Sequence, residues 1–421
     1  MRPNLSPDPD VATRLLEGLA ARTHDGVGIT REAYGPGERV AHALAREEAE
    51  RAGLAVSVDH MGNLYATLPG ADRSRPAILV GSHLDSVRSG GNFDGAAGVA
   101  AGLAALAGMA RAGFVPACDL TVMAIRAEEA GAWFPTSYPG SRGALGLLRP
   151  EELEVRRQDT GRSLAEHMAE EGFDPEAARR GVASLGRDRV AAFVELHIEQ
   201  GPVLEAEDLP VGIVTGIPGS RRLRAARVLG KSDHSGATPR RYRHDAAIAA
   251  AELAHRLDEA WARLDAAGRE LVCTFCVLGT TEAAGFTKIA GEARFELDVR
   301  SVEPAHCDAL FDALHALVTE IEARRGVRIE LGPESGSRPA LMHPAIRDGL
   351  ARTAARLGIP HRLMPSGGGH DAAAFAAAGI PAGMIFVRNQ NGSHNPDEAM
   401  RMEDFALGVG LLQAWLAEQA A

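Results

Sequence analysis

The fold class is indicated most clearly by residues 77–112, which read AILVGSHLDSVRSGGNFDGAAGVAAGLAALAGMARA. The first four residues form a short, continuous apolar run, which is typical of a strand buried on both faces of a sheet. From Gly95 onward the stretch is rich in alanine and glycine and predicts a tightly packed core helix. A buried strand followed by a buried helix is the building unit of an α/β sheet.

The flanking residues continue this alternation of strand and helix. Helical patterns occur at residues 15–21 and 40–52, and the second ends at Gly53, a good helix stop. Further strand patterns lie at residues 54–59, 63–68, 120–125, 193–198 and 380–387. We therefore expect an α/β fold with a mixed, largely parallel sheet and helices on both faces.

The pattern changes around Pro210. Residues 211–331 read as strand, strand, long helix, strand, strand, long helix and strand, which describes a compact α+β unit. After a loop that begins at Gly332, the alanine-rich helices and a buried strand resume. The sequence thus predicts a discontinuous catalytic domain, residues 1–210 and 332–421, interrupted by an inserted domain of residues 211–331. A chain of 421 residues suits two domains.

Composition argues against several classes of function. The net charge is −11 and no Lys/Arg-rich block occurs, whereas binding to nucleic acid or to an anionic membrane needs clustered positive charge. The N-terminus leads to no signal-peptide-like stretch, and the apolar run at 96–110 is too short to span a bilayer. Four cysteines in 421 residues argue against a disulfide framework, so we expect a reducing, cytoplasmic location.

Chemistry-bearing residues follow the first buried strand. His83 and Asp85 come directly after it, at the sheet edge where α/β proteins usually bind ligands. Because they are two residues apart in an extended segment, both side chains face the same way. A metal-bound imidazole needs a polar partner to fix it, and a nearby carboxylate can supply one.

More imidazoles and carboxylates lie at other predicted strand ends. Five candidate metal ligands share this placement: the imidazoles of His83, His197 and His394, the carboxylate of Asp94, and one of the adjacent acids Glu128 and Glu129. Each alone is more often a surface or hydrogen-bonded residue. Together, and without cysteine, they favour a pair of divalent ions such as Zn, Mn, Co or Ni over a structural zinc. Such a pair activates water and polarises a carbonyl, and of the adjacent acids Glu128 and Glu129 one could bind metal while the other acts as the base.

In combination, these motifs resemble the amidase, hydantoinase/carbamoylase family, within the larger aminoacylase/carboxypeptidase metallopeptidase group. The resemblance covers nearly the whole chain and rests on residues 28–31, 62–64, 81–86, 92–95, 126–129, 139–142, 195–201, 233–239, 297–301, 366–372 and 393–396. It implies hydrolysis of a linear amide or ureido C–N bond, with an N-carbamoyl-L-amino acid or related ureido acid as the first candidate substrate. Allantoate amidohydrolase, β-ureidopropionase and dinuclear aminoacylase or dipeptidase activities are the alternatives.

The resemblance also implies a ligand set for two divalent metal ions. Asp94 would bridge both ions, His83 and His197 would complete one site, and Glu129 and His394 would complete the other.

Further roles follow from the same resemblance. Glu128 would be the general base that takes a proton from the attacking water, and Asp85 would orient His83. Gln200, Gly368 and the position of Thr287 would contact the small-molecule substrate. The inserted domain would form a homodimer and act as a lid. His234 would then stabilise the oxyanion in the partner's site, and Arg300 would bind the substrate carboxylate.

Two of these roles have independent support from sequence. Arg300 ends a segment, residues 294–300, in which charged and apolar residues alternate, so it projects from the polar face, where a guanidinium suits carboxylate recognition. A solvated arginine paired with Glu296 or Asp298 is the alternative. His234 lies in a turn-like segment and is expected to be exposed.

The chain departs from the family pattern near the substrate. The family often has Asn where this chain has Thr287 and Pro where it has Ala290, and residues 130–134 and 388–391 also differ. We therefore expect an intact metal site and an altered substrate pocket.

Rival classes have less support. A serine hydrolase is disfavoured because the chain has no G-x-S-x-G elbow. A non-enzymatic scaffold would need neither a full ligand set nor the acidic pair Glu128 and Glu129. Ammonia release would separate ureido hydrolysis from simple deacylation.

Overall fold

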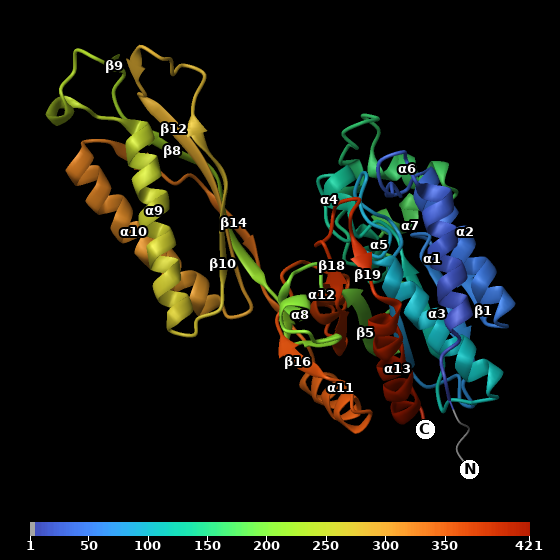
Figure 1. The fold of residues 1–421 in the computed structure, drawn as a ribbon. Coiled ribbons are helices and arrows are strands. Elements are labelled where there is room, and N and C mark those ends of the chain that lie inside the picture. The colour runs from blue at the N-terminus through green and yellow to red at the C-terminus, as the bar shows by residue number, and fades with distance from the viewer. Residues whose placement is uncertain (1–4) are drawn as a thin grey trace. The chain divides into compact units, whose positions relative to one another are not determined.

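The computed structural model describes residues 5–421, which divide into two compact units (Figure 1). Unit 1 comprises the chain up to Ile217 together with Leu341–Ala421, and unit 2 comprises Pro218–Ala340. Both boundaries lie later in the chain than the sequence predicted. The strand β6 (Val211–Val214) pairs with two strands of the unit 1 sheet, and the segment expected as a loop contains β14 (Glu334–Ser337), which pairs with a strand of unit 2.

Unit 1 is built on an eight-stranded sheet with the order β1-β2-β4-β3-β5-β17-β6-β16. Its strands are β1 (Ala55–Val58), β2 (Leu64–Leu68), β3 (Ala77–His83), β4 (Leu120–Ile125), β5 (Val190–Ile198), β6, β16 (His361–Met364) and β17 (Ala382–Val387). The four central strands β4, β3, β5 and β17 are parallel, whereas β1 and β2 form an antiparallel edge. The predicted mixed, largely parallel sheet is therefore confirmed.

Helices cover both faces of this sheet. The larger core joins the sheet to α1 (Pro9–Thr23), α2 (Pro36–Arg51), α3 (Ala96–Arg111), α11 (Pro344–Arg356) and α13 (Met402–Gln419). All residues of α3 from Ala96 to Met109 are buried. The small side chains of this helix allow neighbouring elements to pack closely against it on every side. On the other face, Phe375 of α12 (Ala372–Ala377) stacks on Phe193 of β5, with ring centroids 3.9 Å apart.

Short elements complete unit 1. They are α4 (Ala130–Trp133), α5 (Pro139–Ala144), η1 (Pro150–Glu154), α6 (Leu164–Glu170), α7 (Pro175–Arg179), α8 (Val203–Ala206), β7 (Gly216–Ile217), β18 (Asn389–Gln390) and β19 (Ala399–Met400), and β15 (Ala340–Leu341) spans the boundary between the units. Between residues 5 and 421, no helix combines the length and the apolar character needed to cross a membrane.

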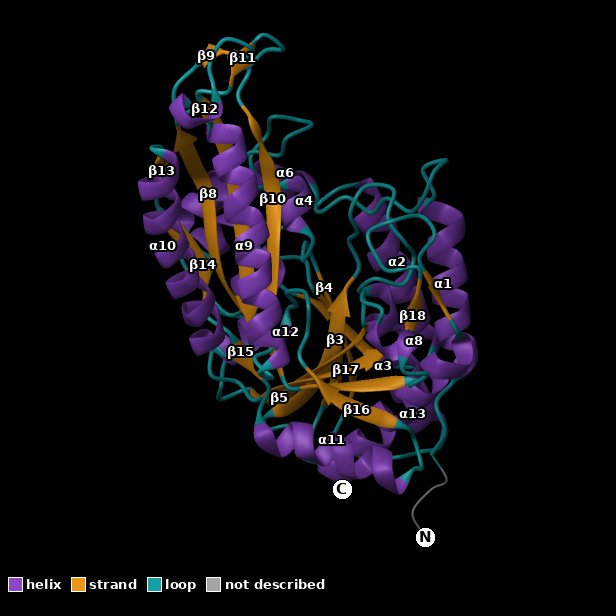
Figure 2. Ribbon diagram, turned by 60° about the vertical axis from the view of Figure 1, so that its left-hand side comes forward, coloured by secondary structure: helices purple, strands orange, loops and turns teal. Residues whose placement is uncertain are grey.

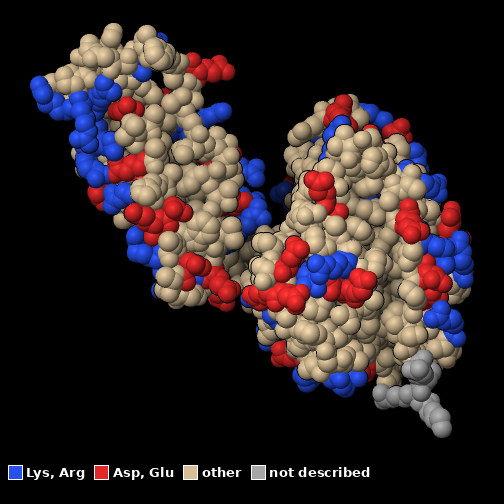
Figure 3. Space-filling view, in the orientation of Figure 1, with Lys and Arg blue, Asp and Glu red and all other residues tan. Residues whose placement is uncertain are grey.

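Unit 2 is an antiparallel sheet backed by two long helices. Its strands follow the order β10-β12-β8-β13, and β14 pairs with β8. Figure 2 shows β8 (Gly219–Leu229), β10 (Val272–Thr280) and β12 (Glu292–Ser301) beside α9 (Ala246–Ala266) and α10 (Pro304–Arg325). The smaller elements are β9 (Asp233–His234), η2 (Arg240–Tyr242), β11 (Lys288–Ile289) and β13 (Arg328–Glu330). This agrees with the expected α+β composition. On the face shown in Figure 3, acidic and basic side chains are interspersed on both units.

Candidate metal centre

The predicted ligands of unit 1 meet at the carboxyl ends of neighbouring parallel strands. His83 is the last residue of β3, and His197 lies one residue before the end of β5. Glu129 follows β4, Asp94 precedes α3, and His394 follows β17 and β18. Carboxyl ends of adjacent parallel strands lie at one edge of a sheet, so residues from distant parts of the chain converge there.

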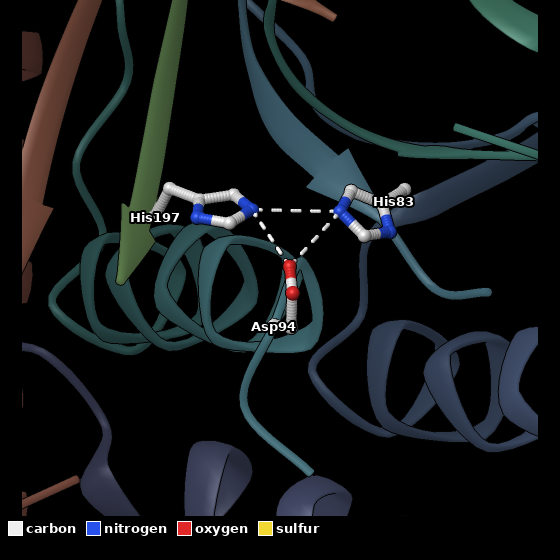
Figure 4. Close-up of side chains that lie close together, drawn as sticks. All are labelled: His83, Asp94 and His197. Carbon is white, nitrogen blue, oxygen red and sulfur yellow. Dashed lines mark hydrogen bonds and ion pairs between the residues drawn. The ribbon is translucent and has the colours of Figure 1, made fainter. Parts of the chain in front are cut away.

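The two buried imidazoles each hold their proton on Nδ1. His83 Nδ1 lies 3.0 Å from the carbonyl oxygen of Asp85, and His197 Nδ1 lies 2.8 Å from that of Ile198. A carbonyl oxygen can only accept, so Nδ1 donates in both rings and Nε2 is the nitrogen left to bind a cation. The two Nε2 atoms lie 3.4 Å apart and face Asp94 Oδ1, at 3.5 Å from His83 and 3.1 Å from His197 (Figure 4).

This convergence of two ring nitrogens and a carboxylate oxygen fits a cation. Asp94 Oδ1 is buried and has no hydrogen-bond partner among residues 5–421, an arrangement that is costly unless a cation lies nearby. Gly95, with φ +66°, keeps the space clear, because a Cβ there would collide with the His83 ring. Two imidazole nitrogens and a carboxylate oxygen suit divalent ions such as Zn, Mn, Co or Ni.

A second group uses the other oxygen of Asp94. His394 Nε2 lies 3.2 Å from Asp94 Oδ2 and 2.8 Å from Glu129 Oε1. Hydrogen bonds to these two carboxylates raise the pKa of His394 to about 10, so a cation binding here must displace a proton. Asp94 thus faces one ligand group with each of its oxygens, as a bridging carboxylate would.

Asp85 positions the acidic pair through the backbone. Its Oδ1 accepts from the Glu128 N–H at 3.0 Å, and its Oδ2 accepts from the Glu129 N–H at 2.9 Å. The resemblance implied that Asp85 orients His83, and the closer contact to His83 comes from the Asp85 carbonyl rather than its carboxylate, which lies 3.4 Å away. The hydrogen bonds from the Glu128 and Glu129 backbone to Asp85 could not be predicted from the sequence.

Glu128 lies beside His83 of the first ligand group and next in the chain to Glu129 of the second, but it belongs to neither group. It is buried, and its Oε2 is 3.9 Å from His83 Nε2. Burial raises the pKa of Glu128 well above its usual range, and the nearby Glu129 adds to this while His83 offsets part of it. A carboxyl group with a raised pKa can take up and return a proton near neutral pH.

Sequence reasoning missed Glu398. Its Oε1 accepts from the backbone N–H groups of Phe93 and Asp94, at 2.8 and 3.2 Å. Ser393 Oγ lies 2.6 Å from Glu398 Oε2 and 2.8 Å from Asp94 Oδ2. Glu398 therefore ties the loop that carries Asp94 to the loop that carries His394. No local pattern marks it, since its partners lie some 300 residues away in the chain.

Gln200 and Gly368 also lie at this centre. Gln200 Nε2 donates to Asp94 Oδ2 at 2.8 Å, and its backbone N–H donates to Asn389 Oδ1 at 2.9 Å. A Cβ built on Gly368 would lie 3.1 Å from Gln200 Oε1, so the glycine loop and the amide are in contact. Asn389 lies in the segment 388–391, which differs from the family pattern. Its hydrogen bond with the Gln200 backbone lets it act on the site by positioning Gln200.

Two other residues that differ from the family pattern, Trp133 and Arg388, contact loops around the site. Trp133 is buried and donates from Nε1 to the Ser86 carbonyl at 2.9 Å. Arg388 pairs with Asp404 through two hydrogen bonds, at 2.8 and 3.0 Å. These two side chains stabilise the loops around the site.

His234, Thr287 and Arg300 belong to unit 2. His234 pairs with Lys288 across β9 and β11, and the Thr287 carbonyl accepts from the Ser235 N–H at 3.0 Å, so His234 and Thr287 lie in one small substructure. His234 is exposed, as expected. Arg300 donates to Asp298 Oδ2 at 2.8 and 3.1 Å, which is the ion pair left open as an alternative.

The fold and the site define an α/β protein with a candidate metal centre at the carboxyl edge of its parallel strands. The chain belongs to peptidase family M20/M25/M40, which residues 79–418 match. This agrees with the metallopeptidase group that the sequence motifs resemble.

The similarity to individual relatives extends over almost the full length of both chains. The chain is 36% identical over 402 residues to an N-carbamoyl-L-amino-acid amidohydrolase of Paenarthrobacter aurescens, covering 94% of each chain. It is 33% identical over 401 residues to the allantoate amidohydrolase of Escherichia coli (strain K12), covering 93% of each. A crystal structure of a hydantoinase/carbamoylase family amidase from Burkholderia ambifaria superposes with a TM-score of 0.88 at 31% identity, covering 99% of this chain and 98% of that one. The predicted family is confirmed.

Proposed function

We propose that this protein hydrolyses a linear ureido C–N bond, with N-carbamoyl-L-amino acids as the substrate class. The observation that carries the proposal is the pair of ligand groups sharing Asp94, with the buried acid Glu128 beside them and outside both. Similarity to N-carbamoyl-L-amino-acid and allantoate amidohydrolases supports a ureido acid as substrate.

Two divalent ions would be held by side chains of unit 1. His83, Asp94 and His197 would hold one, and Asp94, Glu129 and His394 the other. When bound, such ions supply Lewis acidity, which polarises the substrate carbonyl and lowers the pKa of water.

Glu128 would transfer a proton from the attacking water to the leaving nitrogen. It accepts a proton from the water that attacks the ureido carbon, and it returns this proton to the leaving amino-acid nitrogen as the C–N bond breaks. The carbamate formed decomposes to ammonia and carbon dioxide. Ammonia release by metal-reconstituted protein from an N-carbamoyl-L-amino acid tests the proposal. Deacylation of N-acetyl amino acids or dipeptide cleavage without ammonia would instead indicate an aminoacylase or dipeptidase.

Unit 2 would supply substrate contacts and a homodimer interface. His234 Nδ1 accepts from the N–H groups of Gly236 and Ala237 at 3.1 and 3.0 Å, so the neutral ring keeps its proton on Nε2. It is therefore a ready donor to an oxyanion. Arg300 would bind the substrate carboxylate, and closure of such a lid would exclude water from the reaction.

Replacing Arg300 by alanine is expected to raise KM with little change in kcat. Loss of a charge-assisted hydrogen bond costs about 2 kcal/mol, or roughly thirty-fold in KM. Asp298 keeps a second partner, Arg222, at 3.2 Å, so the sheet should tolerate the change. Arg222→Ala is the matched control, because it removes the other partner of Asp298 and should leave KM unchanged. Equal KM values for all three proteins would exclude Arg300 from substrate binding.

His234→Ala is expected to lower kcat by about 100-fold, the effect of losing one oxyanion donor. If His234 serves the partner's site, mixing His234→Ala chains with Glu128→Gln chains regenerates activity, since each mixed dimer holds one site with both residues intact. Mixing Glu128→Gln with His197→Ala is the control, because both changes lie in unit 1 and no intact site can form. Mixtures that exchange subunits and stay inactive would place His234 within its own chain's site or outside catalysis.

A further inference from the structure

Tyr138 meets the glycine loop that borders Gln200 and has no role in the mechanism above. It directly precedes α5 and has φ +53°, a left-handed backbone conformation that is disfavoured for any residue with a side chain. Such a conformation persists only where the surrounding structure imposes it, and it recurs at functional sites.

The backbone of Tyr138 is fixed from both sides. Arg142 donates from its backbone N–H to the Tyr138 carbonyl at 3.0 Å, and its side chain donates to the Ser137 carbonyl at 3.2 Å. The same guanidinium is held by Glu152 through hydrogen bonds of 2.7 and 2.8 Å. Ser141, also in α5, donates to Asp371 Oδ1 at 2.6 Å and so ties this turn to the segment after the glycine loop. The direction of the Tyr138 side chain is thus set by a rigid support.

The phenol reaches the same glycine loop that Gln200 touches. A Cβ built on Gly369 would overlap the Tyr138 hydroxyl, and one built on the adjacent Gly368 would lie 3.1 Å from Gln200 Oε1. Gln200 in turn donates to Asp94 of the metal centre. The Tyr138 hydroxyl therefore meets the loop at Gly369, one residue after Gly368, where Gln200 meets it. Gln200 is the amide that donates to Asp94, the ligand shared by both groups.

The charges of several carboxylates act on this hydroxyl, and no hydrogen bond joins it to any of them. Tyr138 is half-buried, and within the part of the chain that the structure describes its hydroxyl makes no hydrogen bond. Burial raises the pKa of Tyr138, and the charges of Glu128, Asp371 and other nearby carboxylates raise it further, so the group stays protonated. A neutral hydroxyl offers one donor and two acceptor lone pairs to a ligand at the metal centre.

We propose that Tyr138 is a specificity-determining residue that hydrogen-bonds the ureido group of the substrate and so favours carbamoyl over acyl compounds. This inference rests on the proposed function. A carbamoyl group ends in NH2 where an acetyl group of nearly the same size ends in CH3. The phenol oxygen can accept from the NH2 group, whereas a methyl group would leave the hydroxyl unpaired. Sites built around such a bond discriminate more strongly than apolar pockets do.

The test compares two substrates on two variants. Tyr138→Phe keeps the ring and removes only the hydroxyl. Tyr65→Phe is the matched control, because its hydroxyl donates to Asp59 Oδ2 at 2.8 Å in the same unit but outside the site. With metal-loaded protein, kcat and KM are measured for the N-carbamoyl and N-acetyl forms of one L-amino acid. If the acetyl form is not turned over, its inhibition constant against the carbamoyl form replaces its kcat/KM.

Tyr138→Phe is expected to raise KM for the carbamoyl form about ten-fold, the effect of one lost hydrogen bond. The constant for the acetyl form should change less than about two-fold, because no such bond exists there. Tyr65→Phe should change neither. An equal loss for both substrates would show that Tyr138 only supports the fold, and an unchanged carbamoyl KM would show that it makes no contact. A wild-type protein that releases no ammonia would instead overturn the proposed function, before any variant is compared.

Discussion

Removing bound metal with a chelator is expected to abolish hydrolysis, and Zn, Mn, Co or Ni to restore it. His83 Nε2, His197 Nε2 and Asp94 Oδ1 converge on one point, and Asp94 Oδ1 has no hydrogen-bond partner among residues 5–421. The Lewis acidity of such ions is worth several kcal/mol at a reacting carbonyl, so we expect a loss of roughly 10³-fold or more. The measurement pairs ammonia release with elemental analysis of the same samples.

His197→Ala provides a sharper form of this experiment. It removes one ligand of the first group, so the protein should bind fewer ions per chain and stay inactive when metal is added back. His255→Ala, which removes an exposed histidine of unit 2, should change neither quantity. Fully active protein that contains no transition metal would disprove the metal centre.

Glu128→Gln is expected to slow turnover by roughly two to four orders of magnitude while fold and metal content stay unchanged. Glutamine has nearly the same shape but cannot accept the proton of the attacking water. The hydrogen bond that positions residue 128 runs from its backbone N–H to Asp85 Oδ1, so the substitution leaves it in place. The measurement is kcat under saturating substrate and metal.

Glu129→Gln is the contrasting control for this pair. Glu129 contacts His394 at 2.8 Å, so its replacement should weaken metal binding, which Glu128→Gln should not do. Near-normal turnover of Glu128→Gln would place the base elsewhere. A loss of bound metal in that variant would make Glu128 a ligand rather than a base.

Local patterns in the chain were sufficient to predict the fold class and the candidate ligands. The apolar run 77–80 and the alanine-rich helix after it become β3 and α3, because burial on both faces leaves a continuous apolar signal. Ligands in a parallel sheet gather at the carboxyl ends of strands, so the positions of His83 and His197 could be predicted from the strand ends. The short strands β6 and β14 were assigned to the wrong units, because strand pairing is set by distant partners and not by four-residue patterns.

Atomic roles at the site depended on the tertiary structure. The division of the Asp94 oxygens between two ligand groups follows from where three strands and two loops meet. Asp85 holds the backbone of Glu128 and Glu129, more than forty residues away, and Glu398 holds that of Asp94 across some 300 residues. Hydrogen bonds from a carboxylate to a distant backbone N–H have no sequence signature, because every residue except proline presents the same donor.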